Sequence, residues 1–410
     1  MDADVVVIGG GIGGCALATR LAKAGVAVTV LEREATYRDM VRGEAMVPWG
    51  FTEARELGVA DAVLQADGVS VVTRMVPYDE SSTIDQALSR ASDLSAVVPG
   101  APGVIGVGHP ELRAALANAA AEAGAAVVHG VRRTTVVAGD DPQVTFDRDG
   151  AQRTISCRFI VGADGKFSVT RGALGIPMFA SEPRVRLTGM LVDDGGLWDR
   201  DVTTIAVDGR NQFIVIPRAD NKLRLYVGRR VNDPNPLRGP ATLTEFLESY
   251  RTPIFPDHDQ LAESTPIGPC ATFPMNDAWT DTPVVPGGAL IGDAAGWSNP
   301  VTAQGLSITL RDARVLSEAL LDNVAWNPTT LSEYTVERNA RMARLRFASA
   351  LTDLIAGFGM TDRMTRRPRI MRMLGQRPEL GAALAAVHSG PWSVEADSYS
   401  PDILTTLALA

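Results

Sequence analysis

The chain has 410 residues, which is more than one hydrophobic core usually supports, so its length predicts two domains. Its 45% hydrophobic and 21% charged residues are typical of a globular protein, and no apolar run is long enough to span a membrane. The formal net charge of −9 argues against a nucleic-acid partner, because such binding depends on cationic contacts to phosphate.

The first 31 residues predict one strand–helix–strand unit. The chain opens MDAD, without the basic start and long apolar block of a secretory signal, so we expect a cytoplasmic protein. Residues 4–8 (DVVVI) form a buried-strand pattern, residues 12–24 have helical periodicity up to Gly25, and residues 26–31 form a second strand. About 30 residues is the size of one βαβ unit.

Gly9, Gly11 and Gly14 form the pattern G-x-G-x-x-G between that strand and that helix, which is the context the pattern requires. The glycines permit a tight turn, a close approach of backbone amides to pyrophosphate, and close packing of the helix on the strand. Glu32 ends the second strand, where a carboxylate can accept hydrogen bonds from an adenosine ribose diol. Because an acidic residue there disfavours a 2′-phosphate, the sequence predicts bound FAD or NAD rather than NADP.

The later elements predict that this layer is discontinuous. Residues 110–122 are helical in pattern, and residues 125–137 and 155–163 are strand-like. Between residues 181 and 274 the pattern changes to alternating, β-branched segments broken by turn residues, which is typical of an antiparallel sheet. A buried strand at 289–291 and mostly helical residues 305–355 return to the first layer.

Two later segments indicate that the bound dinucleotide is FAD rather than NAD. Residues 162–171 read GADGKFSVTR, and residues 290–305 read LIGDAAGWSNPVTAQG. With the glycine loop they resemble, in order and at similar separations, the three fingerprints of the FAD-dependent aromatic hydroxylases, the single-component flavoprotein monooxygenases of the p-hydroxybenzoate hydroxylase type. The third fingerprint of that family is Gly-Asp-Ala-Ala-His, then Pro, Gly-x-Gly-x-Asn and Asp-Ala. Residues 292–296, Pro300, residues 303–307 and residues 312–313 stand in the same register.

We therefore predict an α/β fold. A Rossmann-like βαβ FAD-binding domain of the glutathione-reductase type carries an inserted, mostly antiparallel β-sheet substrate domain and C-terminal helices. The expected FAD-binding domain comprises residues 1–70, 101–180 and 275–355, the substrate domain residues 71–100 and 181–274, and the C-terminal helical segment residues 356–410. Five arginines of that last segment are expected to form the solvated face of a helix: Arg363, Arg366, Arg367, Arg369 and Arg372.

The resemblance implies which residues contact FAD. Asp293 would accept hydrogen bonds from ribityl hydroxyls, and the amides of Leu306 and Ser307 would stabilise negative charge on reduced flavin. Arg42 would contact the cofactor, unless it is a surface arginine. His109 and Arg113 are alternatives for a contact with the ribityl chain or the flavin, against plain helix capping and salt bridging. The full expected set is Gly9, Gly11, Gly14, Glu32, Arg33, Arg42, His109, Arg113, Asp164, Gly165, Gly292, Asp293, Pro300, Gly305, Leu306 and Ser307.

Three positions depart from the family pattern. Gly296 replaces the family histidine, and Ser307 replaces an asparagine whose inferred contact uses the backbone. Ala303 replaces a glycine where the backbone passes close to the flavin, so its methyl group bears on how freely the ring can move.

The resemblance implies a monooxygenase. In the family, NADPH or NADH binds transiently and reduces the flavin, which reacts with O2 to a C4a-hydroperoxide that hydroxylates an electron-rich aromatic carbon or epoxidises an alkene. We expect no metal, because the four histidines show no ligand spacing, and a monomer or homodimer. The alternatives are an FAD-dependent reductase of isoprenoid-type double bonds and a non-catalytic flavin-binding protein. A flavin-dependent halogenase would need a Trp-x-Trp-x-Ile-Pro segment, which is missing from the sequence.

No catalytic residue can be assigned, because the inserted region has no motif that locates a base. Trp49, Met275 and Trp297 lie near the motif-bearing segments and are candidate walls of the substrate pocket, with core packing as the alternative. Tyr226 shares one face of the KLRLYVG strand with Arg224. That face either lines the pocket or, more simply, faces solvent.

Overall fold

A six-stranded sheet carries the glycine loop in the computed structural model, which describes residues 2–41, 44–237, 242–357, 360 and 362–409. The successive pairs from β22 to β8 are parallel, whereas β21 is antiparallel to β22. The strand order is β21 (Val284–Val285), β22 (Gly288–Leu290), β12 (Phe159–Gly162), β1 (Val5–Ile8), β2 (Val28–Leu31) and β8 (Ala126–Val128). The predicted α/β fold class is confirmed.

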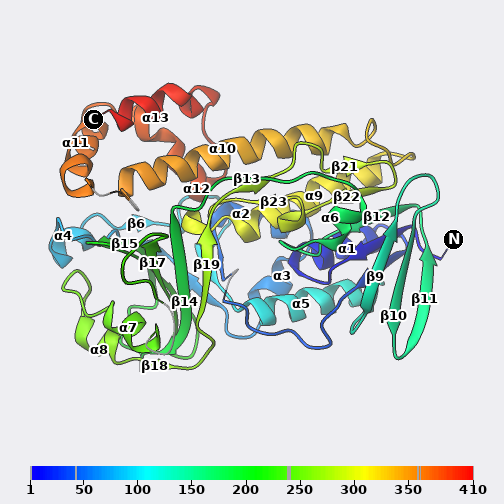
Figure 1. The fold of residues 1–410 in the computed structure, drawn as a ribbon, viewed down its shortest axis with the longest axis horizontal. Helices are drawn as coiled ribbons and strands as arrows, with labels where there is room; N and C mark the ends of the chain where they lie inside the picture. The colour runs from blue at the N-terminus through cyan, green and yellow to red at the C-terminus, as the bar shows by residue number, and fades with distance from the viewer. Residues whose placement is uncertain (1, 42–43, 238–241, 358–359, 361, 410) are drawn as a thin grey trace.

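The side chains of β1 alternate between two covering layers. Val5 and Val7 join an apolar cluster with α1 (Ile12–Lys23), α5 (His109–Glu122) and α9 (Gly305–Asp322). Val6 and Ile8 pack on the opposite side, against a three-stranded antiparallel sheet at one end of the molecule (Figure 1). That sheet consists of β9 (Arg132–Val137), β10 (Gln143–Arg148) and β11 (Ala151–Ser156). Burial on both faces explains why residues 5–8 (VVVI) are all apolar.

Two elements predicted as continuous are divided. The strand expected over residues 125–137 forms β8 and β9, which belong to different sheets. Gly130 lies between them with a left-handed φ of +76°, a conformation that ends an extended run. The helical stretch expected over residues 305–355 forms α9 and α10 (Ser332–Ala356), separated by a loop. In that loop the Asn327 side chain accepts backbone hydrogen bonds from Thr329 and Thr330, a local turn that competes with helix.

The inserted region forms a second, mostly antiparallel sheet. Its long strands are β14 (Val185–Asp193), β17 (Lys222–Arg230), β16 (Asn211–Pro217) and β15 (Val202–Asp208), in that spatial order. β5 (Arg74–Met75) and β6 (Ser92–Asp93) continue beyond β15, and β18 (Thr265–Pro266) and β19 (Ala271–Met275) pair with β14. One face packs against Phe246 of α7 (Thr242–Glu248) and against Tyr250 and Phe255, which follow that helix. α8 (His258–Ala262) lies on the same side. The other face packs toward α9 and α10 (Figure 1).

Short elements connect the two sheets. They are β3 (Ala45–Met46), α2 (Pro48–Glu56), α3 (Ala60–Leu64), β4 (Ser70–Val72), α4 (Ile84–Leu88), β7 (Val104–Gly106), α6 (Val169–Ala173), β13 (Phe179–Ala180), β20 (Ala278–Trp279) and β23 (Gly296–Trp297). In the described ranges, no helix combines the length and the apolar composition that crossing a membrane requires.

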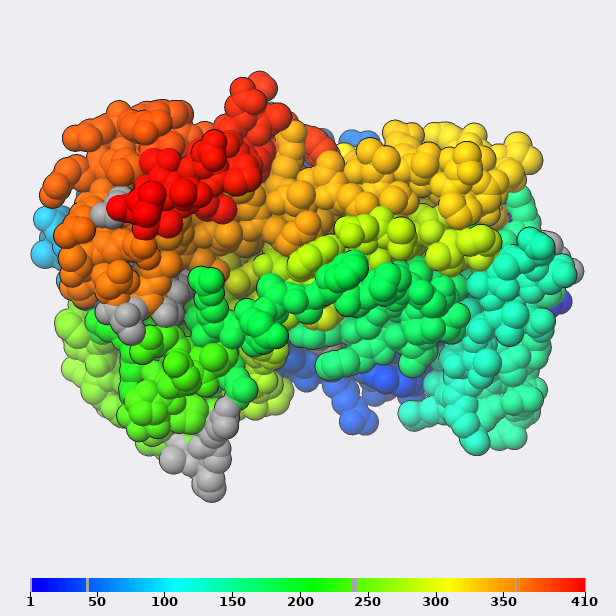
Figure 2. All heavy atoms as spheres, turned by 45° about the horizontal axis from the view of Figure 1, so that its top comes forward, coloured from blue at the N-terminus to red at the C-terminus, as the bar shows by residue number. Residues whose placement is uncertain are grey.

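The residues after α10 fold back over its end (Figure 2). They form a block of short helices. These are α11 (Arg363–Gln376), the 3-10 helix η3 (Pro378–Ala385), α12 (Ala386–Ser389), the 3-10 helix η4 (Ala396–Tyr399) and α13 (Pro401–Ala408). The expectation of a fully solvated basic face on α11 was wrong. Arg363 is buried and pairs with Glu80, and Arg367 Nη2 lies 2.8 Å from Asp79 Oδ2. The acidic partners are nearly 300 residues away in sequence, so the local charge pattern could not show them.

Candidate functional site

The glycine loop joins β1 to α1, and each of its glycines has a separate steric reason. A Cβ on Gly9, whose φ is +108°, would lie 2.4 Å from the Ala163 carbonyl oxygen. A Cβ on Gly14 would lie 2.1 Å from the Gly9 carbonyl oxygen. Gly11 differs, because a Cβ there would have no atom of the described residues within 4 Å. Gly9 and Gly14 are therefore required by packing, whereas Gly11 faces open space at the start of a 12-residue helix.

Glu32 is held at the end of β2 by backbone and arginine contacts. Its Oε2 accepts a 2.8 Å hydrogen bond from the Gly10 N–H, and its Oε1 accepts one of 2.7 Å from the Glu34 N–H. Arg113 Nη2 lies 3.2 Å from Glu32 Oε2. The Arg113 guanidinium also pairs with Glu34 at 3.1 Å and stacks over the Tyr37 ring. The carboxylate is thus fixed in a buried position beside the glycine loop.

Of the two alternatives in α5, Arg113 lies beside Glu32. It forms salt bridges with Glu32 and Glu34, and salt bridging was the alternative to a cofactor contact. His109 is the first residue of α5, one helical turn away. Its contact with the ribityl chain or the flavin stays a prediction. Arg33 is exposed in the loop after β2, and Arg42 lies outside the described residues.

Cys15 lies in α1 next to the loop and is fully buried. Burial raises the pKa of its thiol to about 12. The thiol therefore stays protonated near neutral pH and acts as a small packing group.

Hydrogen bonds within the second motif fix its turn, and its backbone packs against the first motif. The Asp164 carboxylate accepts hydrogen bonds from Ser168 Oγ at 2.5 Å and from the Thr170 N–H and Oγ1, both at 3.0 Å. These contacts occupy the carboxylate, and it is the backbone of Ala163 and Asp164 that lies beside Gly9 of the glycine loop. Arg171 Nη1 donates to the Ala294 carbonyl at 3.0 Å and so joins the second motif to the third.

The third motif is anchored by a buried cluster of charges. The Gly292 N–H donates to Asp312 Oδ2 at 2.8 Å, and the same carboxylate accepts from Arg338 Nε at 3.0 Å and Arg341 Nη2 at 2.5 Å. Arg338 Nη2 also donates to the Gly296 carbonyl at 3.2 Å. Both arginines and Asp312 are fully buried. Burial alone would lower the pKa of the Arg341 guanidinium, but its acidic neighbours raise it above the usual value.

Sequence reasoning missed Arg338 and Arg341. Both come from α10, where they lie three residues apart. The other buried residues near them on this helix are apolar or aromatic: Tyr334, Met342 and Leu345. The signal was present as two arginines at a helical spacing within an apolar stripe. Their partner, Asp312, belongs to the Asp-Ala of the third motif.

Beyond Gly292 the motif runs to the start of α9. Asp293 is half-buried in a 3-10 turn, and Pro300 begins a second one. Ala303 adopts the left-handed conformation, with φ +53°, that the family glycine would take without a side chain. α9 then begins at Gly305, where a Cβ would again meet no atom within 4 Å in the part of the chain that the structure describes. The N–H groups of its first turn have no intrahelical acceptor, so they are available to a ligand.

Gly296 is required for a steric reason of this chain's own. Its φ is +119°, and a Cβ there would lie 2.4 Å from the Ala278 carbonyl oxygen. The position of the family histidine therefore has no room for a side chain. Arg338 supplies a hydrogen bond to the backbone at this point instead.

Three of the four predicted pocket residues share one apolar cluster between the second sheet and α9. Trp49, Tyr226 and Met275 belong to it, together with Val301 and Ile308. Trp49 Nε1 donates to Gln304 Oε1 at 2.9 Å, and Gln304 Nε2 donates to the Val387 carbonyl at 2.8 Å. Trp297 is on β23, and the Lys166 ammonium lies 4.3 Å from its ring centroid.

The face of β17 that carries Arg224 and Tyr226 does not contact solvent, so the simpler interpretation was wrong. Arg224 is 1% exposed and donates to Glu44 Oε2 at 2.5 Å and to Asp39 Oδ2 at 2.6 Å. These acids lie some 180 residues earlier in the chain. Burial and the nearby Glu44 carboxylate raise the pKa of Tyr226 well above its usual value. Its phenol is therefore neutral at physiological pH.

The sequence comparisons identify the family. A sequence model described as "FAD binding domain" matches residues 2–348. The chain belongs to this family. FAD is accordingly the cofactor of the chain, and the resemblance to FAD-dependent hydroxylases seen in the motifs is confirmed.

Relatives of this FAD-binding chain include oxygenases of two kinds. It is 25% identical over 329 residues to squalene monooxygenase of Rattus norvegicus, covering 78% of this chain and 55% of the relative. It is 25% identical over 394 residues to aklavinone 12-hydroxylase of Streptomyces peucetius subsp. caesius, covering 85% and 76%. The chain thus spans about half the length of the squalene monooxygenase. The solved structure of CmlS, a flavin-dependent halogenase, matches with a TM-score of 0.76 and 18% identity over 100% of this chain and 77% of that one, which shows a common fold.

The residues present fit FAD. Open space lies above Gly11 at one end and above Gly305 at the other, and each position starts a long helix. The three motifs between these ends contact one another through Gly9–Ala163 and Arg171–Ala294. A ligand along this line would meet glycine-lined backbone at its phosphates and helix N–H groups at its far end.

Proposed function

We propose that this protein is an FAD-dependent monooxygenase that uses NAD(P)H and O2 to hydroxylate or epoxidise an electron-rich aromatic or polyketide-like small molecule. The observation that carries the proposal is the set of contacts that joins the three motifs: Gly9 packs against Ala163, and Arg171 donates to the Ala294 carbonyl. The two curated relatives described above, a monooxygenase and a hydroxylase, support the reaction class. FAD, when bound, would supply the electron transfer from NAD(P)H and the activation of O2.

The chain's own residues would bind FAD and orient its flavin ring. Asp293 would accept hydrogen bonds from the ribityl chain, and the N–H groups of Leu306 and Ser307 would donate to the pyrimidine edge of the flavin. Because these donors belong to an 18-residue helix, they would stabilise the negative charge of the reduced ring without a charged side chain. Glu32 would contact the ribose at the other end, from the position in which Gly10 and Arg113 hold it.

The apolar cluster between the second sheet and α9 would exclude water from the substrate side. Its members include Trp49, Tyr226 and Val301. Exclusion of water favours transfer of oxygen to the organic substrate over its loss to solvent. Since the raised pKa keeps the Tyr226 phenol protonated, that residue would act as a hydrogen-bond donor or a wall, and not as a phenolate base.

The test is purification with FAD, followed by a screen of phenols, indoles and polyketide-like aromatics for compounds that stimulate NAD(P)H oxidation. The expected product contains one atom from 18O-labelled O2. Flavin binding without any stimulated oxidation would support a non-catalytic flavin protein. Product formation without O2, with a double bond reduced, would support an isoprenoid-type reductase. Either result would overturn the proposal.

A further inference from the structure

Asn299, which precedes Pro300 in the third motif, is held by two carboxylates from other parts of the chain. It is 9% exposed, its backbone N–H donates to Asp277 Oδ1 at 2.8 Å, and its side-chain Nδ2 donates to Asp353 Oδ2 at 3.3 Å. Asp277 directly precedes β20, and Asp353 lies in the last turn of α10. The Asn299 side chain therefore connects the third motif to the end of α10.

The same side chain shapes the backbone that leads to α9. Asn299 Oδ1 accepts a 3.1 Å hydrogen bond from the Val301 N–H and so caps the 3-10 turn η2 (Pro300–Thr302). This turn leads through Ala303, in its left-handed conformation, to the start of α9. Because a carboxamide has one oxygen acceptor and one nitrogen donor group, the cap and the bond to Asp353 together fix the orientation of the side chain. A change in the contacts of Asn299 therefore reaches the segment expected beside the flavin.

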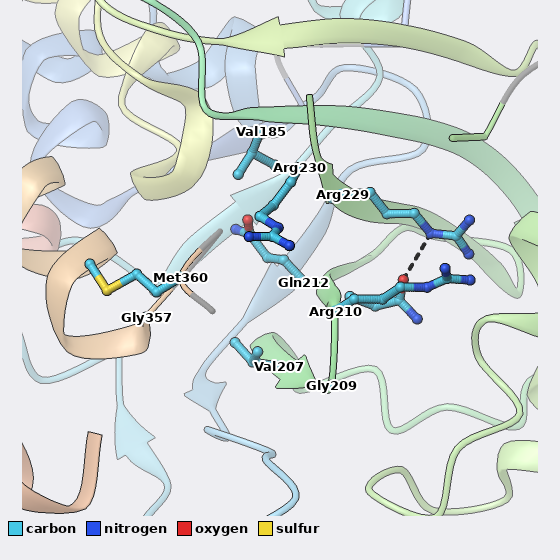
Figure 3. Close-up of a pocket in the computed structure, with 11 residues that line it drawn as sticks. Val185, Val207, Gly209, Arg210, Gln212, Arg229, Arg230, Gly357 and Met360 are labelled. Carbon is cyan, nitrogen blue, oxygen red and sulfur yellow. Dashed lines mark hydrogen bonds between the residues drawn. The ribbon is translucent and has the colours of Figure 1, made fainter. Parts of the chain in front are cut away.

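Hydroxyl groups attach the same segment to α10. Ser349 Oγ lies 3.1 Å from Thr302 Oγ1 and 3.3 Å from Ser298 Oγ, on either side of the asparagine. α10 ends one turn beyond Asp353, and the next residue, Gly357, lines a cavity of about 240 Å³ beside the second sheet (Figure 3). Serine and threonine hydroxyls do not titrate near neutral pH, so these bonds persist while those to the carboxylates can change.

Both carboxylates lie where a charge is costly. In the part of the chain that the structure describes, neither forms an ion pair, and the cations that act on them are Arg184 for Asp353 and Arg346 for Asp277. Arg346 is influenced in turn by Asp281. Burial, together with the Asp277 charge, raises the pKa of Asp353 to about 7. Burial also raises the pKa of Asp277, against the opposing effects of the backbone N–H that it accepts from and of Arg346. Asp353 is therefore the member of the pair that exchanges a proton near neutral pH.

We propose that Asn299 is a positioning residue for the flavin end of the cofactor site, and that the proton on Asp353 controls how firmly it is held. An ionised Asp353 accepts a charge-assisted hydrogen bond from Asn299 Nδ2, which is roughly twice as strong as the bond to a neutral carboxyl group. The segment from Pro300 to the start of α9 is then ordered before FAD binds, so less free energy is lost in ordering it. FAD binding therefore favours the ionised form of Asp353 and releases part of a proton to the solvent. This inference rests on the placement of the flavin in the proposed function, and not on the oxygenase reaction.

The experiment is calorimetric titration of the apoprotein with FAD between about pH 6 and pH 8, in buffers of different ionisation enthalpy. We expect FAD to bind at least about threefold more tightly at the upper end of this range, with proton release around pH 7. Asp353→Asn keeps a neutral acceptor for Asn299, so it should bind FAD as the parent does at the lower end of the range, with a flatter profile and without this proton release. Asp322→Asn, at the exposed end of α9, is the matched control and should behave as the parent does.

Asn299→Ser is a second, independent variant. A serine hydroxyl can still cap the Val301 N–H, but it is too short to bond Asp353 as well. We therefore expect a folded protein in which FAD binding has lost the part of its pH dependence that belongs to Asp353. Adding Asp353→Asn to this variant should change the affinity for FAD no further.

Coincident pH profiles of the parent and Asp353→Asn would overturn the inference, and so would tighter binding of FAD by the parent at the lower end of the range. Asn299→Ser with its proton release intact would also overturn it, because the asparagine would then act only as a cap. If the profiles differ as expected but no compound stimulates NAD(P)H oxidation, the proposed function fails and the positioning role of Asn299 stands. If oxidation is stimulated while the profiles coincide, the reverse holds.

Discussion

Asp312→Asn should destabilise the protein strongly, because Asp312 is the shared partner of two buried arginines. Its carboxylate accepts from Arg338 at 3.0 Å and from Arg341 at 2.5 Å, and all three side chains are fully buried. Removing one charge from a buried ion pair costs about 3–5 kcal/mol, because the other charge is left uncompensated. Whole domains are stable by only about 5–15 kcal/mol, so the loss is a large fraction of the free energy of unfolding.

Equilibrium unfolding in guanidinium chloride measures this loss, and titration with FAD measures its effect on the site. We also expect weaker FAD binding by Asp312→Asn, since the Gly292 N–H loses its anionic acceptor. The control is Asp322→Asn, at the exposed end of the same helix, which should change the free energy of unfolding by no more than about 0.5 kcal/mol. An Asp312→Asn protein as stable as this control would refute the view that the buried cluster anchors the third motif.

Three further changes test other parts of the site. Gly11→Ala should leave the stability of the apoprotein unchanged but lower its affinity for FAD, because the added methyl enters open space where the phosphates are expected. The control is Gly375→Ala, whose added methyl also meets no atom of the described residues. Equal FAD affinity of the two variants would contradict the assignment of Gly11 to the phosphate site. Gly296→Ala should lower the melting temperature of the apoprotein, because its Cβ would lie 2.4 Å from a carbonyl oxygen at a φ of +119°; an unchanged melting temperature would show that the backbone can shift there. Burial, together with the nearby Asp277 carboxylate, raises the pKa of Asp353 to about 7. Between about pH 4 and pH 7 the folded protein therefore keeps a proton on Asp353 that the unfolded chain has lost. The free energy of unfolding falls as the pH rises through this range. Asp353→Asn should therefore be more stable than the parent at pH 8, by about 1–3 kcal/mol, with the difference shrinking toward pH 4, and a difference independent of pH in thermal unfolding would exclude this explanation.

The sequence was sufficient to predict features whose cause is local. The glycine loop is an example, because a strand, three glycines and a helix in a fixed spacing leave few other structures. The β8–β9 division could have been seen in Gly130, but the β-branched residues on both sides of it resemble one continuous strand. The buried arginines could not be predicted as such. Arg224 and Arg338 look like surface residues until the acids that neutralise them, some 180 and 26 residues away, are brought to them by the fold.

The hydrogen bond from Gln304 to Val387 joins the start of α9 to a residue that is synthesised 83 positions later. The proposed adenosine end uses Glu32 and Arg113, and the glycine loop beside them packs against Ala163, so this end needs only the first 164 residues or so. The proposed flavin end also needs Val387. A nascent chain would therefore complete the proposed adenosine end first and the proposed flavin end only after α12 has been synthesised.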